Sequence, residues 1–512
     1  MKKYILAICI LGTLCSSCEN NQEKIRNVED WTQYVEPRIG TAHCRWFHFT
    51  PGALPFGLAK PAPSTNGSLG NKWGWEATGY DYRENTIEGF PCLHEFQVGG
   101  IVLMPTSGKL VTVPGLPTDS VKTGYRSHFS RENEIATAGY YSVLLDDYQI
   151  QAELTATPRV AFQRFTFPKG TDNHILFNIG NRQGESGAVK DAYVTYTADG
   201  HIEGWVITMP EYVKKYQPGA TVPLYFSAVL DRKPESYGSF HGNTQLADAK
   251  ESKGTGAGMY FTFSNEQQEA VTAKIGLSYT SVENARINLQ TEAEGKTFED
   301  AKEQAHQIWQ EYLGRIEVET SKREDKVKFY TGLYHALLGR GLANDVNGAY
   351  PRNDGSVGQL PMKEGKPQYN VYNTDAAWGA QWNLSQLWTL AYPEYMSEYV
   401  SSHIQAYKDA GWLADGLANN RYVSGVGTNL LSTIIAGAYQ CGIRDFDTKL
   451  AYEACLKNEL DGKDRPFGAG KVNTAEFVKY GYVPHQDQGE GYHETFMFSA
   501  SHTLESVSYT HL

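Results

Sequence analysis

The sequence predicts two domains of different class, an N-terminal β-sandwich followed by a C-terminal helical domain. The chain has 512 residues, a length that suits more than one domain. Apolar residues make up 41% of it, enough for large cores. Near residue 296 the hydrophobic pattern changes from the alternation that is typical of strands to the spacing that is typical of helices.

Alternation of apolar and polar residues predicts many strands in the first part of the chain. Turns rich in Gly, Asn, Asp and Pro separate them without intervening helices, which is typical of a sandwich. The predicted strands are Gly100–Met104, Tyr140–Leu145, Ile150–Thr155, Ala161–Phe167, His174–Ile179, Ala192–Thr197, Gly204–Ile207, Pro223–Leu230, Gly258–Phe263 and Val271–Tyr279.

Helical spacing of apolar residues follows. Ser321 and Glu324 form a capping-box pattern before one helix, and Gly411, Gly442 and Gly481 stand where C-terminal caps are expected. The predicted helices are Phe298–Leu313, Val327–Leu338, Ala376–Leu390, Pro393–Ala410, Thr428–Gln440, Phe446–Asn458 and Ala475–Tyr480. The expected divisions are a signal peptide at 1–17, a tether at 18–30, the sandwich at 31–290, a helical linker at 291–320, the helical catalytic domain at 321–505 and a non-native tail at 506–512.

The N-terminus predicts export. A basic start at Lys2-Lys3 precedes an apolar core at 4–14, too short for a permanent membrane helix. Cys18 follows two serines, as in a bacterial lipoprotein signal, so we expect a lipid on Cys18 and a place at the outer membrane or in the periplasm. Simple cleavage of the signal is the alternative. No later segment has about 18 uninterrupted apolar residues, so we expect membrane contact through the lipid alone.

Composition narrows the ligand class. The net charge of −12 argues against nucleic acid, which needs a basic surface. Aromatic residues reach 12%, which suits neutral polar ligands such as sugars. Four cysteines follow the leader without a C-x-x-C spacing, which argues against zinc. We expect unpaired buried thiols, with a Cys44–Cys92 disulfide as the alternative.

A segment rich in Gly, Pro, aromatic and His residues spans 39–100. It is poor strand material and predicts a loop system that shapes a pocket. An aromatic side chain here could stack on a sugar face, and acidic or His side chains could bind hydroxyls; the alternative is a loop-rich core. The candidate substrate-binding residues are Trp73, Trp75, Asp81, His94 and Glu95.

Two further segments carry candidates. Asp375 and Trp378 precede and begin a predicted helix, where Asp375 could instead be a cap and the Trp378–Trp382 pair could be core. Near the end of the chain stand Glu494 and Glu505, and glycoside hydrolysis needs an acid together with a base or a nucleophile. Charge alone does not choose among such carboxylates. A serine-hydrolase elbow, a Walker loop and a His-Glu-x-x-His motif are absent.

Together these segments resemble glycoside hydrolase family 92, the calcium-dependent exo-acting α-mannosidases. The resemblance runs from about Asn27 to Glu505 in a consistent order of motifs. The motifs that carry it are Val35–Thr41, Pro51–Gly57, Gly74-Trp75, Thr78–Tyr82, Gly89-Phe90 with His94, Phe329–His335, Gly442–Asp447, Tyr452–Ala454, Gly481–Pro484 and Ser501–Glu505.

The resemblance implies a β-sandwich and an (α/α)6 barrel with the active site between them. It implies removal of terminal α-linked mannose from glycans, N-glycans among them, with inversion and with Ca²⁺ near the sugar. An α-1,2 linkage is the expected type, although the sequence does not fix it. The candidate acid is Glu505, with Glu494 as the alternative.

Two departures from the family pattern bear on function. Where the family has a Trp-Asp pair that holds mannose, this chain has Trp378-Gly379, so that carboxylate is missing unless Asp375 substitutes for it. The last motif breaks off after Glu505. We expect the base and several calcium ligands beyond that point, and therefore a truncated, inactive 512-residue chain. The alternatives are another inverting (α/α)6 glycosidase and a non-catalytic glycan-binding lipoprotein. Nothing in the sequence indicates an oligomeric state.

Overall fold

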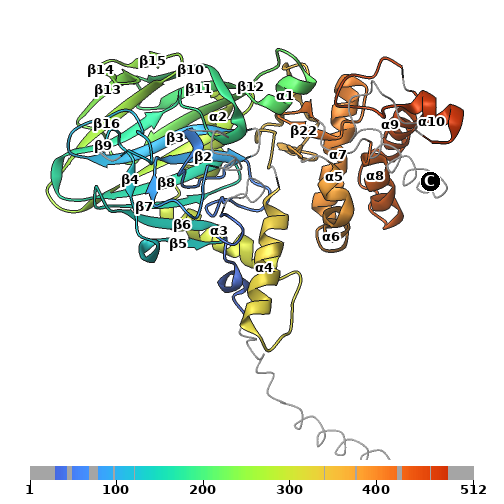
Figure 1. Cartoon of the computed structure of the whole chain (residues 1–512), viewed down its shortest axis with the longest axis horizontal. Coiled ribbons are helices and arrows are strands. Elements are labelled where there is room, and N and C mark those ends of the chain that lie inside the picture. Colours follow the sequence, from blue (N-terminus) through green and yellow to red (C-terminus); the bar gives the residue numbers. More distant parts are fainter. Residues whose placement is uncertain are drawn as a thin grey trace, which may run out of the picture.

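The structure is a computed structural model that shows a sheet-rich N-terminal domain followed by a helical domain beside it (Figure 1). This arrangement confirms the predicted order of fold classes. The structure describes residues 29–42, 49–68, 79–95, 98–119, 122–339, 341–374, 377–423, 429–461 and 463–482.

Two antiparallel sheets form the sandwich. The nine-stranded sheet has the order β15 (Glu251–Lys253), β10 (Ala188–Tyr196), β11 (Ile202–Met209), β12 (Val222–Leu230), β17 (Glu269–Ser278), β8 (Val160–Phe167), β7 (Ile150–Ala156), β6 (Tyr140–Leu145) and β5 (Ile135–Thr137). The six-stranded sheet has the order β14 (Thr244–Ala247), β13 (Ser236–His241), β16 (Ala257–Asn265), β9 (Gly170–Asn178), β3 (Val98–Ser107) and β2 (Phe90–Glu95). A separate short pair joins β1 (Thr86–Ile87) to β4 (Ser127–His128).

The core lies between the two sheets. Alternate residues of β11 are buried and partly exposed, as the period of two requires when one face packs inward. Phe226 of β12 stacks on Phe177 of β9 in the facing sheet, with ring centroids 6.4 Å apart.

Every predicted strand is present. The predicted loop system is wrong for Phe90–Glu95, which is a buried edge strand paired with β3; its alternation is hidden because both faces are covered.

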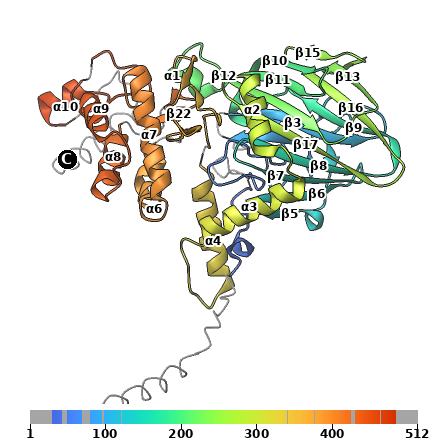
Figure 2. The same cartoon turned by 180° about the vertical axis from the view of Figure 1, so that it is seen from behind.

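Helices α2 (Val282–Ala293) and α3 (Phe298–Leu313) lie across the outer face of the nine-stranded sheet (Figure 2). Gly276 permits the close approach of α2, because a Cβ there would lie 2.3 Å from the carbonyl oxygen of Ala285. Thr297 and Asp300 form the capping box of α3. The capping box predicted at Ser321 is wrong, since α4 (Arg323–Leu338) begins after Lys322 without a side-chain cap.

The helical domain follows α4. Its helices are α5 (Ala377–Gly379), the π-helix η5 (Ala380–Leu384), α6 (Ser385–Ala391), α7 (Pro393–Ala410), α8 (Leu431–Gln440), α9 (Thr448–Leu460) and α10 (Thr474–Tyr480). Its short hairpins are β18 (Ala349–Pro351) with β19 (Val357–Gln359), β20 (Met362–Lys363) with β21 (Lys366–Pro367), and β22 (Gly416–Ala418) with β23 (Arg421–Val423). Gly411 and Gly481 cap α7 and α10 in the left-handed conformation, as predicted.

The small helix α1 (Glu211–Tyr216) leaves the sandwich toward β23 of the helical domain. One hydrophobic cluster is continuous through both domains, so the domains share a core.

Within the described ranges, no helix is long and apolar enough to cross a membrane. Cys92 and Cys455 are free, buried thiols, as predicted, whereas the free thiol of Cys441 is exposed. Cys44, the partner in the alternative disulfide, lies outside the described residues.

Candidate functional site

A buried ion pair marks the junction between the two domains. The ammonium of Lys60 lies 2.8 Å from a carboxylate oxygen of Glu95 at the end of β2, and neither side chain is exposed. The same ammonium donates hydrogen bonds to the carbonyl oxygens of Leu338 and Gly339, at 2.8 and 2.7 Å. These carbonyls belong to the C-terminal end of α4, where unsatisfied acceptors and partial negative charge favour a cation. Lys60 thus ties the sandwich to the end of α4, after which the helical domain begins.

Tyr279 and Asn373 lie beside this ion pair. Burial, and then the negative charge of Glu95, raise the pKa of the Tyr279 hydroxyl well above its ordinary value, while the Asn373 side chain acts in the opposite direction. Tyr279 comes directly after β17 of the sandwich, and Asn373 comes from the helical domain. The junction therefore gathers Glu95, Tyr279 and Asn373 from distant parts of the chain.

A tight hairpin completes this cluster. The backbone N–H of Asn419 donates to the side-chain oxygen of Asn373 at 2.6 Å. Asn419 and Asn420 both have positive φ, 49° and 56°, and join β22 to β23, so they form the two-residue turn that Asn tolerates best among side-chain-bearing residues. The side-chain oxygen of Asn419 is buried and has no hydrogen-bond partner among the described residues. A buried unpaired acceptor of this kind is suited to a ligand or a water.

Asp81 and His94 are both buried near the Gly79 backbone. Asp81 is buried and accepts hydrogen bonds from the backbone N–H and the Nε of Arg83, both at 2.9 Å, so it shapes its own turn. His94 packs on the backbone of Gly79, where a Cβ would lie 2.1 Å from the imidazole. Adjacent residues of a strand point to opposite faces, which separates His94 from Glu95. Of the three predicted polar residues, Glu95 is the one in the junction cluster.

Trp378 lies at the start of the helical domain. It is partly exposed and meets Trp382 edge to face, with ring centroids 5.3 Å apart, which confirms that the two share a face. Trp382 belongs to the π-helix η5, and such helices are frequent at functional sites. Gly379 between them is exposed, and a Cβ there would meet no atom within 4 Å. A side chain at position 379 would therefore have room.

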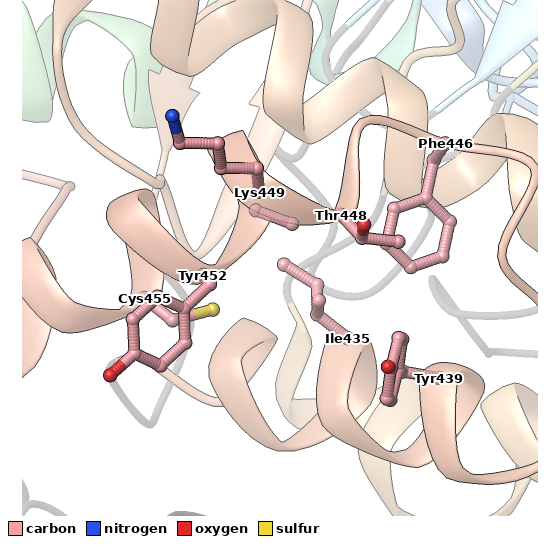
Figure 3. A pocket seen from close by; sticks show the side chains of 8 residues that line it. Ile435, Tyr439, Phe446, Thr448, Lys449, Tyr452 and Cys455 are labelled. Atoms are coloured by element: carbon pink, nitrogen blue, oxygen red, sulfur yellow. The ribbon is translucent and has the colours of Figure 1, made fainter. Parts of the chain in front are cut away.

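A hollow lies between α8 and α9 (Figure 3). It is a cavity of 290 Å³. The residues that line it are Ile435, Tyr439, Phe446, Thr448, Lys449, Ala451, Tyr452 and Cys455. Among the described residues of this lining there is no carboxylate, and glycoside hydrolysis needs an acid together with a base or a nucleophile.

Several predicted site residues lie outside the described residues. They are Cys18, Trp73, Trp75, Asp375, Glu494 and Glu505. The sequence reasoning also missed Lys60, Tyr279, Asn373 and Asn419. The Asn419-Asn420 turn could have been found from its residue types, whereas the other three acquire their meaning from contacts across the domain junction.

The described residues contain no cluster of ligands for the calcium that the family resemblance implies. In the part of the chain that the structure describes, no group of three or more His, Cys, Asp or Glu side chains could hold a metal ion. Calcium prefers six to eight oxygen ligands, among them carboxylates. The described residues of the junction cluster do not provide such a ligand set.

Comparison with known families matches both domains. The model of the glycosyl hydrolase family 92 N-terminal domain matches residues 34–278, and the model of the family's catalytic domain matches residues 284–510. A protein of Arthroderma benhamiae described as an uncharacterized secreted glycosidase is 25% identical over 493 residues, which cover 90% of this chain and 56% of the relative.

Solved structures share the fold. A family GH92 α-mannosidase from Bacteroides thetaiotaomicron superimposes with a TM-score of 0.83 at 22% identity, covering 94% of this chain and 62% of that one. An inverting GH92 mannosidase from the same bacterium has a TM-score of 0.78 at 22% identity, covering 94% and 64%. The chain thus spans about three fifths of the length of these relatives. With both family models matched along its length, the chain belongs to glycosyl hydrolase family 92.

Proposed function

We propose that the protein hydrolyses terminal α-linked mannose from glycans, with inversion and with a requirement for Ca²⁺. The observation that supports this best is the match of both family models, whose boundary falls at the polar junction cluster. Structural relatives are mannosidases, one of them in complex with mannoimidazole. Because the chain covers 62% of the first of these relatives, its activity and substrate are proposals.

The proposed reaction needs two carboxyl groups with distinct roles. In inversion an acid protonates the leaving oxygen and a base activates water, with the carboxyls about 6.5–9.5 Å apart. We assign the acid to Glu505, with Glu494 as the alternative. Glu95 faces Lys60 in a buried ion pair that also holds the end of α4, so we assign it to shaping the site.

The test is release of mannose by the protein expressed from its complete gene. α-1,2-, α-1,3-, α-1,4- and α-1,6-linked mannobioses would be compared with the matching glucosides. NMR of the first product distinguishes inversion, which gives β-mannose, from retention. The Glu505→Gln variant should lose activity by at least about 100-fold if Glu505 is the acid. Faster hydrolysis of the glucosides would favour the alternative of another inverting glycosidase.

Calcium is tested separately. Mannose release should stop in the presence of a chelator and return when Ca²⁺, but not Mg²⁺, is added in excess, because the two ions demand different coordination. Activity that is indifferent to chelation would remove calcium from the proposal while leaving mannose hydrolysis intact.

A non-catalytic glycan-binding protein is the second candidate, and Gly379 favours it. The exposed open space at Gly379 stands where the family resemblance implies a carboxylate for mannose. If the protein only binds, calorimetry will show mannoside binding without product. The Gly379→Asp variant should then bind mannosides more tightly, since the added side chain meets no atom within 4 Å.

Export is supported by the secreted relative, and we propose a lipid anchor at Cys18. Labelling with a fatty-acid analogue should mark the wild-type protein. The Cys18→Ala variant should be unlabelled and recovered in the soluble fraction. Membrane retention of that variant would exclude this anchor.

A further inference from the structure

Three aromatic side chains form a row across the outer face of the nine-stranded sheet. Tyr193 of β10 is directly opposite Trp205 of β11, and Trp205 is directly opposite Tyr225 of β12. The rings of Tyr193 and Trp205 are 6.1 Å apart between centroids and are inclined by 30°. Direct cross-strand neighbours on one face hold their side chains side by side, so the three aromatic residues form one row across the three strands.

The row faces outward. Its strand neighbours Val194, Val206 and Phe226 are buried between the two sheets, and alternate residues point to opposite faces. Tyr193, Trp205 and Tyr225 are each partly exposed. Helix α2 covers the same face over β17 and β12, while β10 and β11 extend beyond it (Figure 2). The outer end of the row is therefore accessible.

Polar side chains border the row on the neighbouring positions. The hydroxyl of Tyr193 donates to Glu251 at 2.8 Å. Glu203 accepts from Ser227 at 2.8 Å and from the Nε of Arg286 at 2.7 Å. His201 lies 3.0 Å from Ser227. Ser227 is buried, whereas Glu203, His201 and Arg286 are partly exposed and Glu251 is exposed, so these four can bind the hydroxyls of a molecule that stacks on the rings.

We propose that this row, Tyr193–Trp205–Tyr225, is a second glycan-binding site, which binds the pyranose rings of a chain outside the catalytic centre. One face of a pyranose consists of C–H groups and stacks on aromatic rings, while its hydroxyls need the donors and acceptors that border the row. A protein partner suits the surface less well, because the centres of protein interfaces are depleted in charge and Glu203, Arg286 and Glu251 adjoin this row.

The row leads toward the domain junction. Tyr225 pairs with Ser278, and Ser278 donates to Asp345 of the helical domain at 3.0 Å. The next residue, Tyr279, belongs to the junction cluster. A glycan on the row would thus be held close to the junction between the two domains. The choice of mannose polymers as ligands rests on the proposed function.

Affinity electrophoresis in gels that contain yeast α-mannan tests the proposal with the full chain. The variants Trp205→Ala and Tyr193→Ala should bind at least about tenfold more weakly, a loss of about 1.4 kcal/mol. The matched control is Tyr480→Ala, which removes an exposed tyrosine from α10 and should leave binding unchanged. Trp205→Phe keeps a ring and should retain most of the binding. Thermal melting of each variant confirms that it is folded.

Hydrolysis separates this site from the catalytic one. With the protein expressed from its complete gene, Trp205→Ala should release mannose from mannobiose at the wild-type rate and from mannan more slowly. Wild-type binding of mannan by both folded alanine variants would overturn the proposal. So would self-association in sedimentation that disappears in Trp205→Ala, since the row would then be a contact between copies. If no variant hydrolyses anything, the proposed function fails while the gel measurement still decides this site.

Discussion

The sandwich and the helical domain complete their cores in different ways. In the sandwich, inward side chains such as Phe177 and Phe226 meet across two sheets and are fully buried. In the helical domain, large apolar side chains of α6, α9 and α10 stay exposed: Leu390 at 83%, Leu460 at 66% and Val478 at 69%. Strand alternation assigns each side chain to a buried or an outer face by local geometry. A helix face is buried only where another element packs on it.

The largest expected effect lies in the sandwich core. Phe226→Ala should lower the free energy of unfolding by about 3–5 kcal/mol, because it removes a fully buried ring and leaves a cavity. Chemical denaturation measures it. The control is Ile135→Ala in β5 of the same sheet, whose side chain is 53% exposed and whose loss should cost less than about 0.5 kcal/mol. Equal costs would contradict the assignment of the core to the space between the sheets.

The junction couples the two regions, and Lys60→Met tests that coupling. The substitution leaves the buried Glu95 carboxylate without its ammonium, a change that costs about 3–5 kcal/mol in comparable sites. We expect the helical domain to become sensitive to protease before the sandwich does. As a control, Lys122→Met breaks an exposed pair with Asp147, which is worth about 0–1 kcal/mol. Unchanged protection of the helical domain would show that the domains do not depend on Lys60.

A second buried carboxylate at the junction predicts a pH dependence. Burial raises the pKa of Asp345, although Thr280, Asn288 and Ser278 donate to it. With a native pKa above an unfolded value of about 3.9, the native state loses stability as pH rises from the unfolded to the native pKa. The Asp345→Asn variant has no carboxyl at this position and therefore lacks this pH dependence. Its stability relative to wild type should therefore increase with pH over that range, as denaturant titrations at several pH values would show; a flat difference would contradict it.

A smaller effect on stability is expected from loss of a helix cap, and it distinguishes the cap seen at Thr297 from the one predicted at Ser321. Thr297→Ala should cost about 1 kcal/mol, because it breaks the capping box at the start of α3. Ser321→Ala should leave stability unchanged, since α4 begins without a side-chain cap. Denaturant midpoints compare the two variants directly. A larger loss at Ser321 would restore the cap that the sequence predicts there.

The smallest effect is expected on the exposed helix face. Leu390→Gln should change stability by less than about 0.5 kcal/mol, because the side chain is 83% exposed. A loss of about 2–5 kcal/mol, typical of a buried leucine, would mean that another part of the protein covers this face. Comparison with Phe226→Ala then measures how far the two regions differ.

Local pattern was sufficient for much of the fold. The helix at Phe298–Leu313, the helix at Pro393–Ala410 and the strand at Tyr140–Leu145 were predicted with the bounds that the structure shows. The helix at Phe298–Leu313 shows the reason: its buried residues lie on one face, so they recur with the period of the helix. Phe90–Glu95 was missed because both of its faces are covered and the alternation disappears.

The candidate site was likewise predicted from the sequence only in part. Glu95 was predicted from the type and density of the residues around it, and membership of family 92 followed from motifs in order. No sequence motif marks Lys60, Tyr279 or Asn373 as a site residue. They become a cluster because β2, β17 and the loop before α5 end at one junction.

Sequence therefore determined what each segment is, and the tertiary structure decided what each segment meets. Periodicity, caps and turn residues act over a few neighbouring residues, which is why the chain alone specifies them. The partner of the Lys60 ammonium, the row of Tyr193, Trp205 and Tyr225, and the exposure of Leu390 depend on strand register and on packing between elements. Register and packing are long-range outcomes that cooperative burial selects.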